Sequence, residues 1–318
     1  MSTKITGIYD ARKELGWGKS IIMGLQQCFA MFGATILVPV LTNSYGEGIV
    51  GLSASVTLFC AGVATLWFHF ITKGKVPVFL GSSFAFLGMY QAIIPQYGKE
   101  YATGGVVAAG GLYVILAILI KVLGTKRVMK LFPPAVCGPL IILIGINLAG
   151  SAIDNLFTNW MLGIVPILVI IICNIWGKGM IKIVPILIGI VVSYIVAIFM
   201  GEVNFEAISS SQVFAMAPLS LPKFSFSAVV TIMPIALATM MEHIGDMAAI
   251  SATTGKNYLN DPGLHRTLLG DGLATSLSAL GGGPANTTYG ENTGVLALSK
   301  VYDPRVIRIA ACFAILVS

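Results

Sequence analysis

The chain has 318 residues, of which 56% are hydrophobic and only 10% are charged, and its mean hydropathy is +0.90. Because soluble domains carry about 25% charged residues, this composition excludes a soluble globular protein and predicts a chain that lies in a lipid bilayer. The net charge of +6 would suit a nucleic-acid partner, but the positions of the basic residues, given below, argue against one.

The first twenty residues, MSTKITGIYDARKELGWGKS, are polar and contain no apolar signal segment, which indicates an amphipathic or irregular cytoplasmic tail. Apolar runs then recur to the end of the chain. They predict about eleven membrane spans, at Ser20–Leu41, Ile49–Ile71, Leu80–Ile94, Gly104–Leu123, Pro134–Leu148, Trp160–Trp176, Ile183–Met200, Phe226–Ile250, Thr267–Leu280, Tyr289–Leu298 and Val306–Ser318. The last run ends with the chain, so we interpret the sequence as one cut short after its eleventh span.

The basic residues support this division into spans. With the N-terminus in the cytoplasm, all 19 lysines and arginines fall in inside loops except Lys99 and Lys223. The sequence therefore predicts a multi-pass protein of the cytoplasmic membrane, and the positive charge forms a band on the inner face rather than a nucleic-acid site.

Two segments far apart in the chain combine glycine, β-prone residues and a new helix start. Lys75–Ile93 reads KVPVFLGSSFAFLGMYQAI, and Gly281–Lys300 reads GGGPANTTYGENTGVLALSK. Irregular backbone at membrane depth is tolerated where protein or a water-filled cavity satisfies it, and two such segments are typical of inverted-repeat transporters. Glycines can also simply allow close helix packing, which is our interpretation of Gly110-Gly111.

Carboxylates inside the predicted spans are the candidate functional groups. Glu242 and Asp246 lie four residues apart, on one helix face, and Glu291 follows the second broken segment; Asp271 is a further candidate. The alternatives are a structural pair or a charge that reaches the membrane interface. His243 lies off that face and is interpreted as a packed neighbour.

These groups suit a particular kind of ligand. Carboxylates accept hydrogen bonds from N–H groups and exchange protons, whereas the backbone N–H groups of helix starts bind carbonyl oxygens. An aromatic ring such as Phe84 or Tyr289 packs on a flat molecule. Together they predict a pocket for a small planar molecule such as a lactam ring.

The same residues carry a family resemblance. ENTGVLALSK resembles the signature of nucleobase–ascorbate transporters, in which Gln, Glu or Pro precedes Asn-x-Gly, four further residues follow, and a Ser or Thr and then a basic residue or Gly complete the motif. The segments LQQCFAMFGATILVPVL, GSSFAF, LFPPAVCG, MEHIGD and DPGLHR resemble bacterial uracil permeases in the same order, from about Leu25 to the last residue.

The resemblance implies an all-α polytopic membrane fold of fourteen spans in two inverted seven-span repeats, with two short strand and half-helix segments. A core of spans 1–4 and 8–11 would move against a gate of spans 5–7 and 12–14. On this chain the core would be residues 1–132 and 226–318 and the gate residues 133–225, with spans 12–14 absent.

The resemblance also implies proton-coupled uptake of uracil by alternating access, without a cofactor other than the proton, in a protein that forms a homodimer. It assigns base binding to Glu242, Glu291, Phe84, Tyr289 and Gly290. It assigns proton coupling or support to four residues, namely Glu242, Asp246, Asn292 and Gln27. Some uracil permeases carry His at the positions of Asp246 and Gln27, which leaves the coupling open.

Other functions remain as alternatives. A xanthine or other purine permease of the same family is one, although such carriers more often have Gln where this chain has Glu291. A channel or anion carrier on the same scaffold would need a cation beside the site, and none stands near Glu242 or Glu291. An intramembrane enzyme is disfavoured, because the histidines (His69, His243 and His265) are dispersed and the cysteines (Cys28, Cys60, Cys137, Cys173 and Cys312) form no metal-binding or disulfide pattern.

Overall fold

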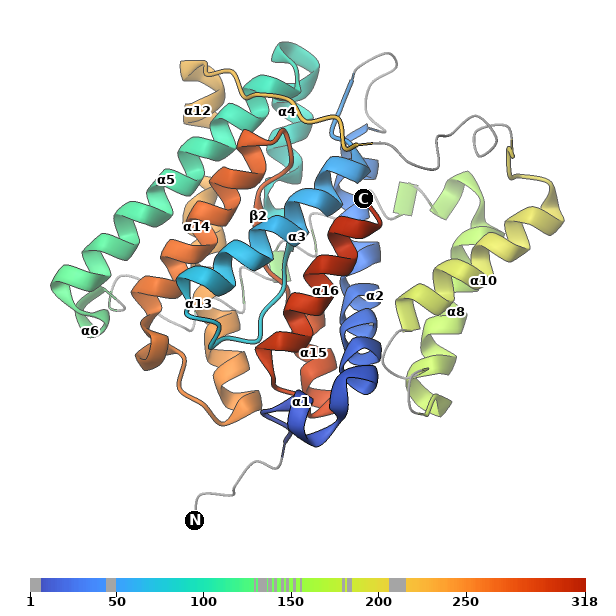
Figure 1. Cartoon of the computed structure of the whole chain (residues 1–318). Helices are drawn as coiled ribbons and strands as arrows, with labels where there is room; N and C mark the ends of the chain where they lie inside the picture. The colour runs from blue at the N-terminus through green and yellow to red at the C-terminus, as the bar shows by residue number, and fades with distance from the viewer. Residues whose placement is uncertain are drawn as a thin grey trace. The chain divides into compact units, whose positions relative to one another are not determined.

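The computed structural model describes residues 7–43, 50–128, 130, 136, 139, 142–143, 146, 149–150, 153–154, 156–178, 181, 185–205 and 216–318 (Figure 1). Its contacts divide the chain into two compact units. Unit 1 comprises Met1–Ile141 and Ala217–Ser318, and unit 2 comprises Ile142–Met216.

Unit 1 repeats one order of elements twice: a long helix, a second helix, a short strand followed by a half-length helix, and a further helix. The first half contains α1 (Ala11–Glu14), α2 (Gly16–Asn43), α3 (Ala54–Ile71), β1 (Leu80–Ser82), the 3-10 helix η1 (Phe84–Phe86), α4 (Leu87–Tyr97), α5 (Lys99–Leu123) and α6 (Thr125–Val128). The second half contains α12 (Phe226–Ile232), α13 (Ile235–Thr254), the short π-helix η2 (Leu259–Gly263), α14 (Leu264–Leu280), β2 (Asn286–Thr288), α15 (Gly290–Ser299) and α16 (Pro304–Leu316).

The chain is an all-α polytopic membrane protein. Within the described residues, four helices are long and apolar enough to cross a membrane: Gly16–Asn43, Ala54–Ile71, Lys99–Leu123 and Phe226–Thr254, the last counted across the short break described next. The predicted fifth span, Pro134–Leu148, lies largely outside the described residues. The other predicted spans coincide with helices or with the two strand and half-helix segments.

The predicted eighth span differs from the structure in one respect. We predicted a continuous helix over Phe226–Ile250, whereas α12 ends at Ile232 and α13 begins at Ile235. Pro234 stands at this break. Proline has no N–H to donate and its ring clashes with the preceding turn, which is why the helix is interrupted there.

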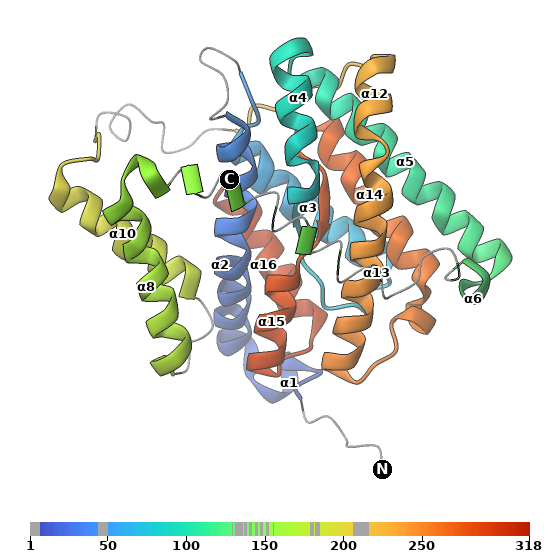
Figure 2. The same cartoon turned by 180° about the vertical axis from the view of Figure 1, so that it is seen from behind.

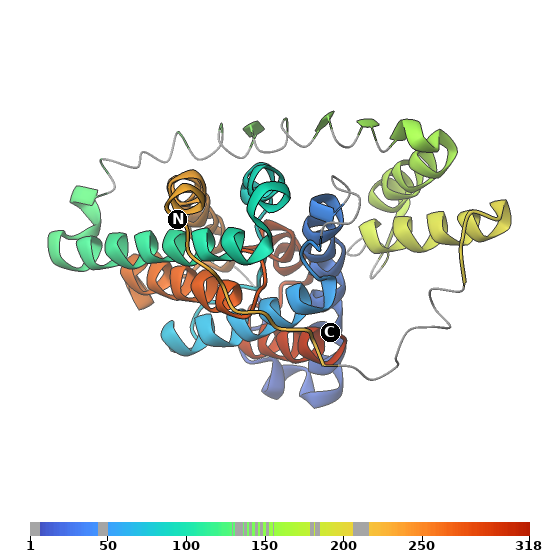
Figure 3. The same cartoon turned by 90° about the horizontal axis from the view of Figure 1, so that it is seen from above.

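Close packing of glycines joins the two halves of unit 1. Helix α14 packs against α5 and α3, and α16 packs against α3 and α2 (Figure 3). A Cβ atom at Gly272 would lie 2.2 Å from Cβ of Tyr113, and one at Gly110 would lie 2.5 Å from the carbonyl oxygen of Gly272. The packing role predicted for Gly110 is therefore confirmed, whereas the space around Gly111 is open.

Unit 2 contains two helices that pack on each other, α8 (Trp160–Trp176) and α10 (Pro185–Met200). A Cβ atom at Gly189 would lie 3.1 Å from Cγ1 of Ile170, so a small residue there allows the close approach. Ser193 Oγ donates a hydrogen bond of 3.0 Å to the carbonyl oxygen of Leu162. Such interhelical hydrogen bonds are a common means of holding membrane helices together.

The segment before α2 is docked against the protein rather than free. Ile8 forms a parallel bridge with Val301, in which Ile8 N donates to the Lys300 carbonyl at 2.8 Å and Tyr302 N donates to the Ile8 carbonyl at 2.7 Å. The hydroxyl of Tyr9 donates to the carbonyl of Thr254 at 2.5 Å. The segment thus ties the end of α13 to the loop between α15 and α16, a contact that the polar sequence did not indicate.

Asp303 anchors this docked segment, and its removal is expected to destabilise unit 1. Its buried carboxylate accepts hydrogen bonds from the backbone N–H of Ala11 at 2.8 Å and from that of Arg305 at 2.9 Å, where it caps α16. We expect Asp303→Ala to lower the free energy of unfolding by about 1–3 kcal/mol, because the buried N–H of Ala11 and the capped N–H of Arg305 lose their acceptor. Thermal unfolding in detergent measures the effect against exposed Glu14→Ala, and equal stability of the two variants would contradict it.

Candidate functional site

The two broken segments meet in the interior of unit 1, at a crossing formed by β1 and β2. Strands β1 and β2 pair antiparallel, with Leu80 opposite Thr288 and Ser82 opposite Asn286. The pairing continues at both ends, because Tyr289 N donates to the Phe79 carbonyl at 3.0 Å and Ser83 N to the Ala285 carbonyl at 2.8 Å. These bonds satisfy backbone groups that would otherwise be buried without partners, and the prediction of two strand and half-helix segments is confirmed.

A helix begins directly after each strand. Helix η1 starts at Phe84 after Ser83, and α15 starts at Gly290 after Tyr289. Ser83 and Tyr289 have extended backbones, and neither side chain caps the helix that follows. Both helix starts therefore present backbone N–H groups and the positive end of the helix dipole to any ligand at the crossing. Figure 2 shows α4 and α15 leaving the crossing toward opposite ends of the unit.

The ring of Tyr289 packs against β1, and its hydroxyl contacts both β1 and α2. Its hydroxyl donates to the Ser82 carbonyl at 2.8 Å and lies 3.3 Å from Thr35 Oγ1 on α2. A Cβ atom at Gly81 would lie 2.4 Å from Cζ of this ring, so the ring fills the space beneath β1. Because the ring is occupied by these contacts, the substrate contact predicted for Tyr289 would involve its backbone.

Phe84 and Gly290 lie on the more open side of the crossing. Phe84 is half-buried and packs against the main hydrophobic core of the unit. Gly290 is exposed, and a Cβ atom there would meet nothing within 4 Å. This leaves room for a ligand next to the first turn of α15.

The structure brings the predicted carboxylates to one region. Glu242 and Asp246 are half-buried on α13, which packs against α15, and Glu291 is exposed in the first turn of α15 (Figure 2). Glu242 lies within electrostatic range of Asp246, Asp271 and Glu291. Thr288 Oγ1 donates a hydrogen bond to Asp246 Oδ2, which ties β2 to α13. The result is an acidic face beside two helix starts.

Asn292 and Gln27, which the resemblance assigns to coupling or support, contact each other. The buried side-chain amide of Asn292 donates to Gln27 Oε1 at 2.7 Å and to the Gln27 carbonyl at 3.0 Å. This contact fixes the first turn of α15 to α2. Among the described residues, Asn292 Oδ1 and Ser83 Oγ are buried and have no hydrogen-bond partner.

We expect Asn292→Leu to lower the free energy of unfolding by about 1–3 kcal/mol, because the side-chain oxygen of Gln27 would stay buried without a donor. Thermal unfolding in detergent measures the change, with exposed Leu298→Ala in the same helix as the control. A variant as stable as the wild type would show that Asn292 does not hold α15.

A second set of polar residues, missed as a group by the sequence analysis, lies behind the crossing. His243 Nδ1 lies 3.1 Å from Asp271 Oδ2, and both side chains are fully buried. Tyr113 on α5 lies close to Asp271 and to Thr287 of β2, so the pair stands next to the crossing. Asp271 was recognised as a possible buried carboxylate, but Tyr113 gave no signal, because its partners come from other helices.

Known proteins are similar to this chain over nearly its whole length. A family model described as "Permease family" matches residues 18–318. A probable uracil permease of Pasteurella multocida (strain Pm70) is 40% identical over 314 residues, which cover 96% of this chain and 73% of that protein. A uracil permease of Bacillus caldolyticus is 40% identical over 323 residues, covering 97% and 73%.

The chain belongs to this permease family, that of the nucleobase–ascorbate transporters. Membership makes it an integral membrane transporter rather than an enzyme. Among solved structures, the transmembrane domain of a cyanobacterium bicarbonate transporter, BicA, matches 99% of this chain and 84% of that chain, with a TM-score of 0.62 and 15% sequence identity. At that identity the likeness shows the fold alone, which is that of a transporter domain.

Proposed function

We propose that this permease takes up a nucleobase, uracil in the first place, together with a proton by alternating access. The observation that carries the proposal is the crossing of β1 and β2, where two uncapped helix starts stand beside Glu242 and Glu291. The names of the relatives, which are uracil permeases, support the choice of substrate.

The chemistry of uracil matches the donors and acceptors of this region. Uracil is a flat ring in which two N–H groups alternate with two carbonyl oxygens, and the remaining edge carries two C–H groups. Glu242 and Glu291 would accept hydrogen bonds from the ring N–H groups, and the backbone N–H groups at Gly290 and in η1 would donate to its carbonyls. Phe84 would pack on its face.

Proton coupling would use the acidic face. Carboxylates that stand close together in an apolar surrounding take up protons more readily than exposed ones. Glu242 and Asp246 are half-buried on the same helix, and Asp246 already accepts a hydrogen bond from Thr288. We assign proton exchange to this pair, with Asn292 and Gln27 holding α15 in place; no cofactor other than the proton is required.

In this proposal, the core that carries the substrate is residues 1–132 and 226–318, which lie within unit 1, and the gate is residues 133–225, which include unit 2. The N-terminus lies in the cytoplasm, because this orientation places all basic residues but Lys99 and Lys223 on the inner side. The protein resides in the cytoplasmic membrane and pairs as a homodimer.

Two measurements on the purified chain test the substrate and the coupling. Radiolabelled uracil should bind in detergent and be displaced by unlabelled uracil but not by xanthine; stronger displacement by xanthine would favour a purine permease. In proteoliposomes, an inward proton gradient should drive uracil accumulation that a protonophore abolishes. Accumulation that is insensitive to the protonophore would refute proton coupling without affecting the binding result.

A further inference from the structure

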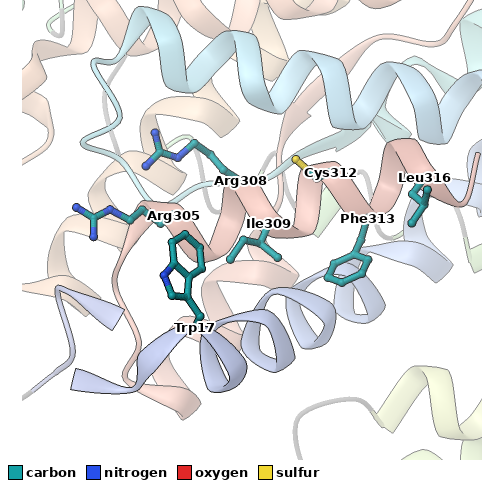
Figure 4. Close-up of a pocket in the computed structure, with 7 residues that line it drawn as sticks. All are labelled: Trp17, Arg305, Arg308, Ile309, Cys312, Phe313 and Leu316. Carbon is teal, nitrogen blue, oxygen red and sulfur yellow. The ribbon is translucent and has the colours of Figure 1, made fainter. Parts of the chain in front are cut away.

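A groove unrelated to the crossing runs along the outer face of α16. It has a volume of about 570 Å³ and is lined by Trp17, Arg305, Arg308, Ile309, Cys312, Phe313 and Leu316 (Figure 4). All of these residues belong to α2 or α16 within unit 1. One end of the groove is charged and the rest is apolar.

The charged end carries two arginines that α16 itself does not need. Arg305 and Arg308 lie in the first two turns, where the helix dipole disfavours cations. Arg305 Nη1 lies 3.1 Å from Asp10 Oδ1, and half of its side chain is exposed. Arg308 has no ion-pair partner among the described residues. The end of the groove therefore keeps positive charge for an external anion.

Trp17 stands at the same level as the arginines. Its side chain is 58% exposed, and Arg12 Cζ lies 5.3 Å from the centre of its ring. Exposed tryptophans of membrane proteins gather where the lipid headgroups meet the hydrocarbon. The charged end of the groove thus lies at headgroup depth.

The apolar part of the groove has the length of one lipid leaflet. Ile309, Phe313 and Leu316 are spaced by four and three residues and share one face of α16 (Figure 4). From Arg305 to Leu316 the helix rises about 16 Å, close to half of the roughly 30 Å hydrocarbon core of a bilayer. Leu316, at the far end, is strongly exposed.

We propose that this groove is a binding site for one anionic phospholipid. The phosphate and the acidic headgroup sit between Arg305 and Arg308, whose guanidinium groups bind phosphate oxygens in a forked geometry. The glycerol and ester region packs beside Trp17, and one acyl chain follows Ile309, Phe313 and Leu316. Charge complementarity selects the anionic lipid over a zwitterionic one. The site is independent of the substrate proposed above.

Trp17 is a natural probe for this lipid. Replacing Trp67, Trp160 and Trp176 by Phe leaves Trp17 as the single tryptophan of the full chain. The protein is placed in two kinds of phosphatidylcholine nanodisc. One contains phosphatidylglycerol with brominated acyl chains, and the other contains the same mole fraction of phosphatidylcholine with brominated acyl chains. We expect stronger quenching by brominated phosphatidylglycerol, corresponding to a local enrichment of about fivefold for each arginine.

Charge variants separate a site from general attraction to the membrane. Arg308→Gln should reduce the excess quenching, and Arg305→Gln/Arg308→Gln should abolish it. Lys121→Gln, which removes an exposed charge from the end of α5, should leave it unchanged. Arg308→Gln breaks no ion pair of the described residues, so its result stands even if the double variant unfolds. Equal quenching by the two brominated lipids, or an excess that survives Arg308→Gln, would overturn the proposal.

Discussion

Glu242→Gln is expected to weaken uracil binding by about 10- to 100-fold. The carboxyl group of Glu242 is half-buried on α13, which packs against α15, and it would accept a hydrogen bond from a ring N–H group. A glutamine places a neutral amide there, which offers a weaker acceptor or turns a donor toward the ring. Equilibrium binding of radiolabelled uracil in detergent measures the loss.

Matched variants identify the cause of that loss. Exposed Glu14→Gln removes the same charge away from the crossing and should bind uracil as the wild type does. Glu291→Gln should show a smaller loss, because Glu291 is exposed and a solvated carboxylate contributes less. Binding of wild-type strength by Glu242→Gln would remove this residue from the substrate site.

Gly81→Ala should abolish uracil binding and also destabilise the protein. A methyl group at this position would lie 2.4 Å from Cζ of Tyr289 and 2.8 Å from Thr35 Oγ1. Either β1 or the Tyr289 ring must shift, and overpacking of this kind costs about 1–3 kcal/mol. Because β1 and β2 position both helix starts, the shift should displace the backbone N–H groups that face the ligand. Thermal unfolding and uracil binding measure the two effects.

Gly88→Ala is the matched control for this change. Gly88 lies in α4 of the same broken segment, and a Cβ atom there meets nothing within 4 Å. Alanine is favoured over glycine within a helix by up to about 1 kcal/mol, so this variant should be at least as stable as the wild type. If Gly81→Ala bound uracil as Gly88→Ala does, the crossing would not be what positions the ligand.

The sequence by itself determined the membrane character, most of the spans and the two broken segments. Hydropathy and the placement of glycines are local properties, so they can be read along the chain. Glu242 and Asp246 could be placed on one face because a helix fixes the spacing of neighbours four residues apart. Their closeness to Glu291 was expected because paired broken segments are typical of transporters with a shared site, and no local pattern indicated it.

Only the tertiary structure decided how the broken segments pair and which side chains support them. Tyr289 and Ser82 are 207 positions apart, and Asn292 and Gln27 are 265 apart, so no periodicity in the sequence links them. The inward direction of the Tyr289 ring depends on the space that Gly81 leaves. The burial of Asp271 beside His243 and Tyr113 depends on three helices meeting. Such contacts are set by helix packing across the whole unit, and a hydropathy pattern carries no information about it.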